Sequence, residues 1–187
     1  SNILDIPKHS FLDGYWQSEL YFKNYSKEIK KIFNFSELDK QNNLIANDIS
    51  KNNSISIHIR RGDFLLKRNN NHNIDLKDYY LKAIGKSSKC FKNPKYFIFT
   101  DDPLWVTENF ILDYSYIIVD VNYGTKSFFD MHLMSLCKSN IIANSSFSWW
   151  SAWLNNNEDK IVYAPKDWFN DKSICTDHLI PNSWNIL

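Results

Sequence analysis

The sequence has 187 residues, which is enough for one well-buried domain and short for two. Its formal net charge of +1 gives no support for bulk binding to nucleic acid, which usually requires a strongly basic domain. Three widely spaced cysteines, the absence of any apolar run near the ~20 residues that cross a membrane, and the absence of a signal peptide predict a cytoplasmic protein, free or peripheral to the membrane.

The first predicted elements are helical. Residues 15–35 mix aromatic side chains with Lys and Glu, which predicts one amphipathic helix. Ser36 followed by Asp39 resembles a capping box, and the apolar spacing after it predicts a second helix. We therefore interpret residues 1–50 as a helical leading segment and residues 51–187 as the main domain.

From residue 51 onward, strand and helix patterns alternate. Short apolar runs predict strands, amphipathic stretches predict helices, and the polar residues 67–73 predict a mobile loop. The predicted strands are 55–59, 96–100, 116–119, 140–143 and 161–164, and the predicted helices begin after Asp75 and at Pro103, Thr125 and Ser146. This alternation implies an α/β, Rossmann-like domain, with a mainly parallel sheet and helices on both faces.

Three polar segments follow predicted strands, where an open α/β sheet forms its ligand crevice. Residues 57–63 read Ile-His-Ile-Arg-Arg-Gly-Asp, and the planar forks of two arginines suit a diphosphate or a carboxylate. Asp101 and Asp102 follow the second strand. Residues 144–148 read Asn-Ser-Ser-Phe-Ser at the start of a helix, where free backbone N–H groups favour an anion. Together these segments suit a diphosphate.

Each segment also has a plainer interpretation. The two arginines would serve equally in a surface turn with an ordinary salt bridge, and Arg-Gly-Asp at 61–63 matches a cell-adhesion tripeptide by chance. Asp101 would suffice as a helix cap, and His58, between isoleucines, would by default be a core histidine. Asp130 stands among apolar neighbours, so it is either the polar side of a helix or a contact to a base or ribose.

The order and spacing of the motifs resemble those of the bacterial α-1,2-fucosyltransferases over almost the whole chain. The matching segments are Leu-Asp-Gly-Tyr-Trp-Gln-Ser-Glu at 12–19, His-Ile-Arg-Arg-Gly-Asp-Phe at 58–64, Phe-Ile-Phe-Thr-Asp-Asp-Pro-Leu-Trp at 97–105, Asp130, Leu-Met-Ser-Leu-Cys-Lys at 133–138, Ile-Ile-Ala-Asn-Ser-Ser-Phe-Ser-Trp-Trp at 141–150, Ala-Pro-Lys at 164–166 and Trp-Phe at 168–169. The Gly-Gly-Leu-Gly-Asn-Gln-like loop that opens family members has no counterpart. The chain therefore looks like the C-terminal, donor-binding lobe of a GT-B-like glycosyltransferase, with the N-terminal lobe absent.

The resemblance implies the activity of a galactoside 2-α-L-fucosyltransferase, a type of hexosyltransferase. Such an enzyme moves L-fucose with inversion from GDP-fucose to the 2-hydroxyl of a galactose-terminated glycan, with no metal or other cofactor. It implies that residues 51–187 form the GDP-fucose-binding domain, and we expect that domain to be inactive by itself. Two rival interpretations stay open: a non-catalytic carbohydrate-binding module built on the seven tryptophans, and another nucleotide- or phosphate-binding protein on the same fold.

The resemblance also implies roles for individual residues. Arg60 would stabilise the β-phosphate of the leaving GDP, with Arg61 beside it either binding or bracing the loop. Asp130 would accept hydrogen bonds from the guanine N1–H and exocyclic amine. Asp63 is the first candidate for the general base, and His72 and Asp75 are weaker ones. The other residues implied in donor binding are His58, Asp101, Asp102, Asn144, Ser145, Ser146, Phe147 and Ser148.

Overall fold

The computed structural model describes residues 7, 9–65 and 70–187. Within these residues lies a six-stranded sheet in the order β3-β2-β1-β4-β5-β6, in which all neighbouring strands are parallel. The strands are β1 Asn53–Ile59, β2 Pro94–Thr100, β3 Ser115–Val119, β4 Ser139–Ile141, β5 Ile161–Ala164 and β6 Asn185–Ile186. The predicted α/β, Rossmann-like fold is confirmed, and β6 is a short edge strand that the sequence pattern did not reveal.

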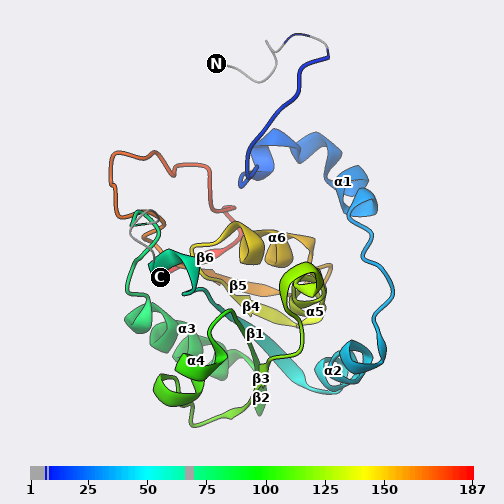
Figure 1. Ribbon diagram of the computed structural model, residues 1–187, viewed down its shortest axis with the longest axis vertical. Helices are drawn as coiled ribbons and strands as arrows, with labels where there is room; N and C mark the ends of the chain where they lie inside the picture. Colours follow the sequence, from blue (N-terminus) through cyan, green and yellow to red (C-terminus); the bar gives the residue numbers. More distant parts are fainter. Residues whose placement is uncertain (1–6, 8, 66–69) are drawn as a thin grey trace.

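Helices cover both faces of the sheet (Figure 1). The helices are α3 Lys77–Cys90 and α4 Pro103–Asn109 on one face, and α2 Lys40–Lys51, α5 Phe128–Leu136 and α6 Ser146–Leu154 on the other. Alternate strand residues point to the two layers. Ile57 of β1 belongs to the same buried cluster as Tyr80 of α3, whereas Phe99 of β2 belongs to the cluster with Ile49 of α2 and Leu133 of α5.

The tryptophans of α6 pack mainly in the core beneath the sheet's carboxyl edge. Trp149 is fully buried and Trp153 is 7% exposed. The ring of Trp150 stacks on Phe22 and Phe33, with ring centroids 5.3 and 5.1 Å apart. Their role in packing is therefore confirmed, and α6 is a rigid support for the residues at its N-terminus.

The prediction of one amphipathic helix over residues 15–35 is wrong. The segment forms two 3-10 turns, Glu19–Tyr21 and Lys23–Tyr25, followed by the short helix α1 Ser26–Ile32. The physical reason is Phe22, which lies between the two turns and is buried against the aromatic rings of α6. Burial of that ring bends the chain, and a straight helix could not follow this path.

Several predicted boundaries also shift. The α2 helix begins one residue after Asp39, whose side chain accepts from the backbone N–H of Asn42 at 2.9 Å, so Asp39 and not Ser36 is the cap. The α5 helix is shorter than predicted, because Gly124, with φ of 55°, begins a 3-10 turn before it. Of the predicted loop at 67–73, residues 67–69 lie outside the described residues.

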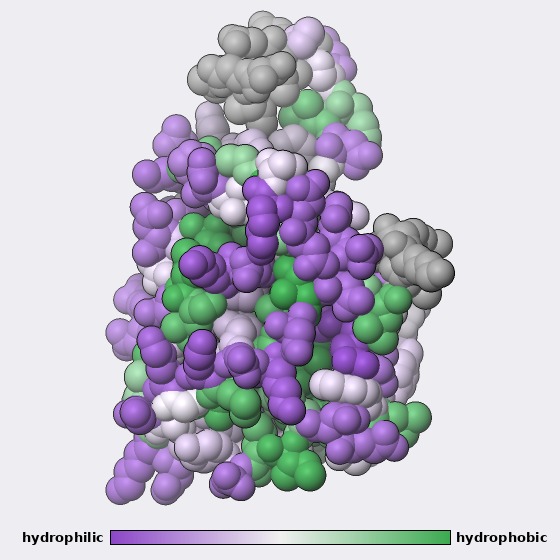
Figure 2. Space-filling model, turned by 90° about the vertical axis from the view of Figure 1, so that its left-hand side faces the viewer, coloured by the Kyte–Doolittle hydropathy of each residue, from purple (hydrophilic) through white to green (hydrophobic). Residues whose placement is uncertain are grey.

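Hydrophilic side chains predominate on the face shown in Figure 2, and apolar side chains lie between them. Among the residues that the structure describes, no helix has both the length and the apolar character needed to span a membrane.

The strand order places the most important crevice of the fold. The chain runs outward from β1 through β2 to β3, then returns to the other side of β1 as β4. In open α/β sheets, ligands bind at the carboxyl ends of the strands where the order reverses in this way. The loops after β1 and β4 flank this point.

Candidate functional site

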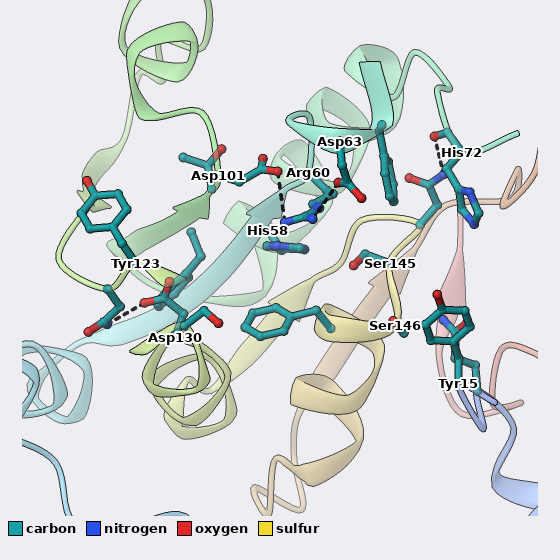
Figure 3. A pocket seen from close by; sticks show the side chains of 18 of the residues that line it. Tyr15, His58, Arg60, Asp63, His72, Asp101, Tyr123, Asp130, Ser145 and Ser146 are labelled. Atoms are coloured by element: carbon teal, nitrogen blue, oxygen red, sulfur yellow. Dashed lines mark hydrogen bonds and ion pairs between the residues drawn. The ribbon is translucent and has the colours of Figure 1, made fainter. Parts of the chain in front are cut away.

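A cavity of about 610 Å³ lies at this edge of the sheet (Figure 3). Its volume falls within the ~300–1,000 Å³ of typical ligand sites. The residues that the sequence predicts for binding or catalysis and that line the cavity are His58, Arg60, Asp63, Asp101, Asp130, Asn144, Ser145, Ser146 and Phe147. Segments that are up to 88 positions apart in the sequence, as are His58 and Ser146, thus share one wall.

Arg60 lies between two carboxylates. Its Nη2 contacts Oδ1 of Asp63 at 2.6 Å, and its Nη1 contacts Oδ2 of Asp101 at 3.0 Å. Oδ1 of Asp101 also accepts from the backbone N–H of Arg61 at 2.9 Å. These contacts hold the guanidinium in one orientation, and a guanidinium has five N–H donors, so donors remain for an anion in the cavity.

The suggestion that Asp101 only caps a helix is wrong. The N-cap of α4 is Asp102, whose Oδ1 accepts from the backbone N–H of Trp105 at 3.1 Å. Asp101 instead orients Arg60 and the turn after β1.

Gly62 allows this arrangement because it has no side chain. A Cβ atom at this position would lie 2.5 Å from Oδ2 of Asp101, which is closer than real Cβ contacts. Any other residue would push the Asp101 carboxylate away from Arg60. The glycine of the Arg-Arg-Gly-Asp segment is therefore required by a close approach.

Three predicted binding residues lie outside the described lining of the cavity: Arg61, Asp102 and Ser148. The Arg61 guanidinium lies 3.6 Å from the ring centroid of Trp105, and its Nε contacts Oδ2 of Asp102 at 3.3 Å. Ser148 is buried, and its hydroxyl donates to the carbonyl oxygens of Ala143 and Ser145. The geometry gives these residues supporting contacts, and their direct ligand contacts stay a prediction.

The N-terminus of α6 forms the cavity wall across from Arg60. Ser145 is the N-cap, and its side chain makes no capping hydrogen bond within the described residues. The first N–H groups of a helix have no partner within that helix, and its dipole favours an anion there. Ser146 and Phe147 continue the lining in the first turn.

Asn144 ties the loops of this wall together. The Nδ2 of Asn144, which is 2% exposed, donates to the carbonyl oxygens of His72 and Trp168 at 2.9 and 3.1 Å. Both of these residues also line the cavity, so a single buried amide fixes three separate segments around it.

His58 is both buried and part of the cavity wall. It is 4% exposed, and its ring lies against that of Phe147 with centroids 5.6 Å apart. Burial lowers the pKa of His58 to about 3, and the positive charge of Arg60 lowers it further, so the imidazole is neutral. No hydrogen-bond partner for its Nδ1 is found among the described residues.

His72 and Asp75, the weaker candidates for the base, are separated by the structure. His72 lines the cavity, and burial lowers its pKa, which the charge of Asp63 partly offsets. Asp75 lines a second, smaller cavity and accepts from the backbone N–H of Lys77 at 3.0 Å.

Asp130 lies at the far end of the cavity from His72, beside Tyr123 (Figure 3). Burial raises the pKa of its carboxyl group to about 7; a hydrogen bond from Asn122 opposes this effect, and the charge of Asp120 adds to it. Nδ2 of Asn122 donates to Oδ1 of Asp130 at 2.7 Å. The buried carboxylate is thus paired, as its apolar sequence context requires.

Sequence reasoning missed two groups of cavity residues. Asn122, Tyr123 and Gly124 follow β3, and the strand-end rule would have found them had it been applied to that strand. Tyr15 and Gln17 come from the N-terminal segment, and no local pattern predicts their approach to the sheet.

The backbone at Trp16 explains how Tyr15 and Gln17 reach the cavity. Trp16 has φ of 53°, in the left-handed region that bulky residues rarely adopt. Nε1 of Trp150 donates to the carbonyl oxygen of Tyr15 at 3.0 Å and fixes the turn to α6. Nε2 of Gln17 and Nε1 of Trp168 are buried and lack a hydrogen-bond partner in the described part of the chain. Polar ligand atoms would satisfy such donors.

The sequence matches the description "Glycosyl transferase family 11" over residues 1–187. The chain belongs to glycosyl transferase family 11. The resemblance to bacterial α-1,2-fucosyltransferases is thereby confirmed at the level of the family. The family 11 chain shares 34% identity over 175 residues with an alpha-1,2-colitosyltransferase of Escherichia coli, covering 91% of this chain and 60% of the relative.

A second relative of this family 11 chain is the O-antigen biosynthesis glycosyltransferase WbnK of Escherichia coli. It is 37% identical over 182 residues, covering 92% of this chain and 60% of the relative. The chain therefore spans about 60% of the length of both relatives. The crystal structure of NodZ α-1,6-fucosyltransferase soaked with GDP-fucose aligns with a TM-score of 0.42 and 16% identity, covering 63% of this chain and 43% of that one.

Gly62→Ala is expected to lower the free energy of unfolding by about 1–3 kcal/mol, because the Asp101 carboxylate must leave its donors. The matched control is Gly85→Ala in α3, where an added Cβ meets no atom within 4 Å. That control should gain about 0.5–1 kcal/mol, as alanine in a helix does. Urea denaturation measures both values, and equal stability of the two variants would contradict the required close approach.

The raised pKa of Asp130 predicts a pH-dependent stability. Its folded pKa of about 7 lies above the ordinary value of 3.8, so the folded state binds more protons between these values. Stability contributed by this group is therefore present at low pH and lost as pH rises towards 7. Asp130→Asn removes the titration and keeps an acceptor for Asn122.

We expect Asp130→Asn to gain on the order of 2 kcal/mol relative to wild type between pH 5 and pH 8. Denaturant unfolding at the two pH values measures this difference. An identical difference between variant and wild type at both pH values would show that Asp130 does not titrate in this range.

Proposed function

We propose that the chain is the donor-binding part of a metal-independent, inverting glycosyltransferase. Its reaction is transfer of L-fucose from GDP-fucose to the 2-hydroxyl of a galactose-terminated glycan. The observation that carries the proposal is the arrangement of Asp130, Arg60 and the N-terminus of α6 around one cavity (Figure 3). These groups offer an acceptor for a base and two kinds of donor for a diphosphate.

The order of groups along the cavity matches the order of parts in a sugar nucleotide. Asp130 and Tyr123 lie at one end, Arg60 lies in the middle, and Tyr15 and Ser146 lie at the other end (Figure 3). A guanine at Asp130 directs its diphosphate towards Arg60 and the sugar towards Tyr15. The buried donors of Gln17 and Trp168 then have sugar oxygen atoms as partners.

In this proposal, Arg60 has the main catalytic role. The bond between the anomeric carbon and the phosphate oxygen breaks through an oxocarbenium-like state, and the leaving diphosphate gains negative charge. Donors that are fixed before the reaction stabilise such charge without reorganisation. The contacts of Arg60 with Asp63 and Asp101 supply this fixed orientation.

We propose Asp63 as the base that takes the proton from the acceptor hydroxyl. It lines the cavity one residue beyond the Arg60–Gly62 turn, within the same wall as the proposed phosphate site. Its 2.6 Å contact with Arg60 must loosen when the phosphate engages that guanidinium. His72, neutral because burial lowers its pKa, is the alternative on the same wall.

The names of the relatives support the linkage and the biological setting. One relative is called an alpha-1,2-colitosyltransferase, which supports transfer to a 2-hydroxyl, and the other is assigned by name to O-antigen biosynthesis. A nucleotide-linked colitose is therefore a second candidate donor. The two-lobed, GT-B-like architecture, with this chain as one lobe, is part of the same proposal.

The experiment that tests the donor site is calorimetric and thermal titration of the 187-residue chain with GDP, ADP, UDP and free fucose. GDP at one hundred times its dissociation constant should stabilise the chain by about 2.7 kcal/mol. ADP and UDP should give smaller shifts. Binding of free fucose without any nucleotide would instead favour a carbohydrate-binding module, and equal binding of all nucleotides would contradict the guanine site.

Arg60→Ala should weaken GDP binding about 10- to 150-fold, because a charge-assisted hydrogen bond contributes ~1.5–3 kcal/mol. Arg60→Lys should recover little, since an ammonium lacks the planar fork. Arg61→Ala is the matched control: its guanidinium lies on Trp105, outside the described cavity lining, so GDP affinity should change less. Calorimetry measures all three, and equal losses for both alanine variants would contradict the assignment of Arg60.

A further inference from the structure

A hydrogen-bonded chain of four side chains links α2 to the nucleotide end of the cavity. Nδ2 of Asn42 donates to Oδ1 of Asp39 and to Oδ1 of Asn122, both at 3.0 Å. Nδ2 of Asn122 donates to Oδ1 of Asn42 at 2.8 Å and to Oδ1 of Asp130 at 2.7 Å. Asn42 is 1% exposed and Asn122 is 8% exposed, although they lie 80 residues apart in the sequence.

The direction of these hydrogen bonds is fixed at the Asp39 end. The Asp39 carboxylate accepts from both the backbone N–H and the Nδ2 of Asn42, and it is anchored as the N-cap of α2. Asn42 must therefore turn its amide nitrogen towards Asp39, which leaves its oxygen for Asn122.

The Asn122 amide has no freedom to reverse. Its oxygen faces the Nδ2 of Asn42, and both hydrogens of its own Nδ2 are used, one by Asn42 and one by Asp130. A reversed amide would place oxygen against oxygen at two contacts, which is costly in a buried site. Asp130 thus always meets a donor and never an acceptor on this side.

We propose that Asn42 and Asn122 are positioning residues that keep Asp130 a hydrogen-bond acceptor and so select a nucleobase with a donor edge. The chain of amides transmits the orientation from Asp39 through the buried pair to the cavity. A guanine presents adjacent N–H donors to a carboxylate, whereas an adenine does not present that pair. The inference deepens the proposed function, because it rests on Asp130 contacting the base.

Charged groups around Asp130 make the role of this donor measurable. Burial raises the pKa of Asp130 to about 7, Asp120 adds to the rise, and the Asn122 hydrogen bond lowers it. Asp39 is shielded by Lys126, whose Nζ lies 3.8 Å from Asp39 Oδ2. His132, on the same helix as Asp130, stacks on Phe35 and is kept neutral because burial lowers its pKa.

The test is GDP and ADP binding by wild type and Asn42→Asp between pH 5.5 and 8.5. Wild-type GDP affinity should fall as pH decreases through about 7, where Asp130 takes up a proton. Asn42→Asp replaces a donor by an acceptor, so Asn122 loses its fixed orientation and Asp130 is more readily protonated. We expect at least a tenfold loss of GDP affinity at pH 7, unchanged ADP affinity, and a higher midpoint pH for GDP binding.

Two variants provide matched controls. Asn47→Asp makes the same chemical change on the exposed side of α2 and should leave GDP affinity and its midpoint pH unchanged. Asp39→Asn keeps an oxygen acceptor for Asn42 and removes only the charge, so the preference for GDP should persist. If Asn42→Asp does not unfold cooperatively, Asn122→Ala removes the donor directly and should give the same two changes.

The outcomes separate the inference from the proposed function. A wild-type chain that binds GDP and ADP equally contradicts the guanine site itself. A wild type that prefers GDP, lost in Asp130→Asn but retained with an unchanged midpoint pH in Asn42→Asp and Asn122→Ala, overturns only the positioning role. A tenfold loss in Asn42→Asp that affects GDP and ADP alike, without a change in midpoint pH, would also overturn it, because that result indicates general loosening.

Discussion

The parallel pairing of β1 with both β2 and β4 is the constraint on which the site depends. Parallel strands end at the same edge, so the loops after them meet there, and the reversal of strand order at β1 leaves a crevice between those loops. The Arg60 turn lies on one side of this crevice and the N-terminus of α6 on the other. The tryptophan-rich packing of α6 keeps that second wall rigid.

Polar groups at this edge are held by one another. Arg60 lies between Asp63 and Asp101, Asn144 bridges two carbonyl oxygens, and Asp130 receives a donor from Asn122. Such fixed orientation reduces the reorganisation needed when a charged ligand binds. The neutral state of His58 follows from the same environment, since burial beside a guanidinium opposes a second positive charge.

Membership of glycosyl transferase family 11 agrees with the resemblance read from the motifs, whereas the site roles rest on geometry and await the binding experiments. Adjacent arginines illustrate the difference. The sequence gives Arg60 and Arg61 equal chemistry, yet one lines the cavity and the other lies on Trp105 beside Asp102. Successive residues at a strand end point in opposite directions, so only their surroundings decide which faces the ligand.

The sequence by itself determined the α/β alternation, the strand ends where polar residues gather, and nine of the residues in the cavity wall. These features follow from local hydrophobic period and from turn chemistry, which short segments encode. Only the tertiary structure decided the bend at Phe22, the approach of Tyr15 and Gln17, and the pairing of Asn42 with Asn122. Each depends on contacts between distant segments, and burial of large rings or saturation of buried amides outweighs local preference there.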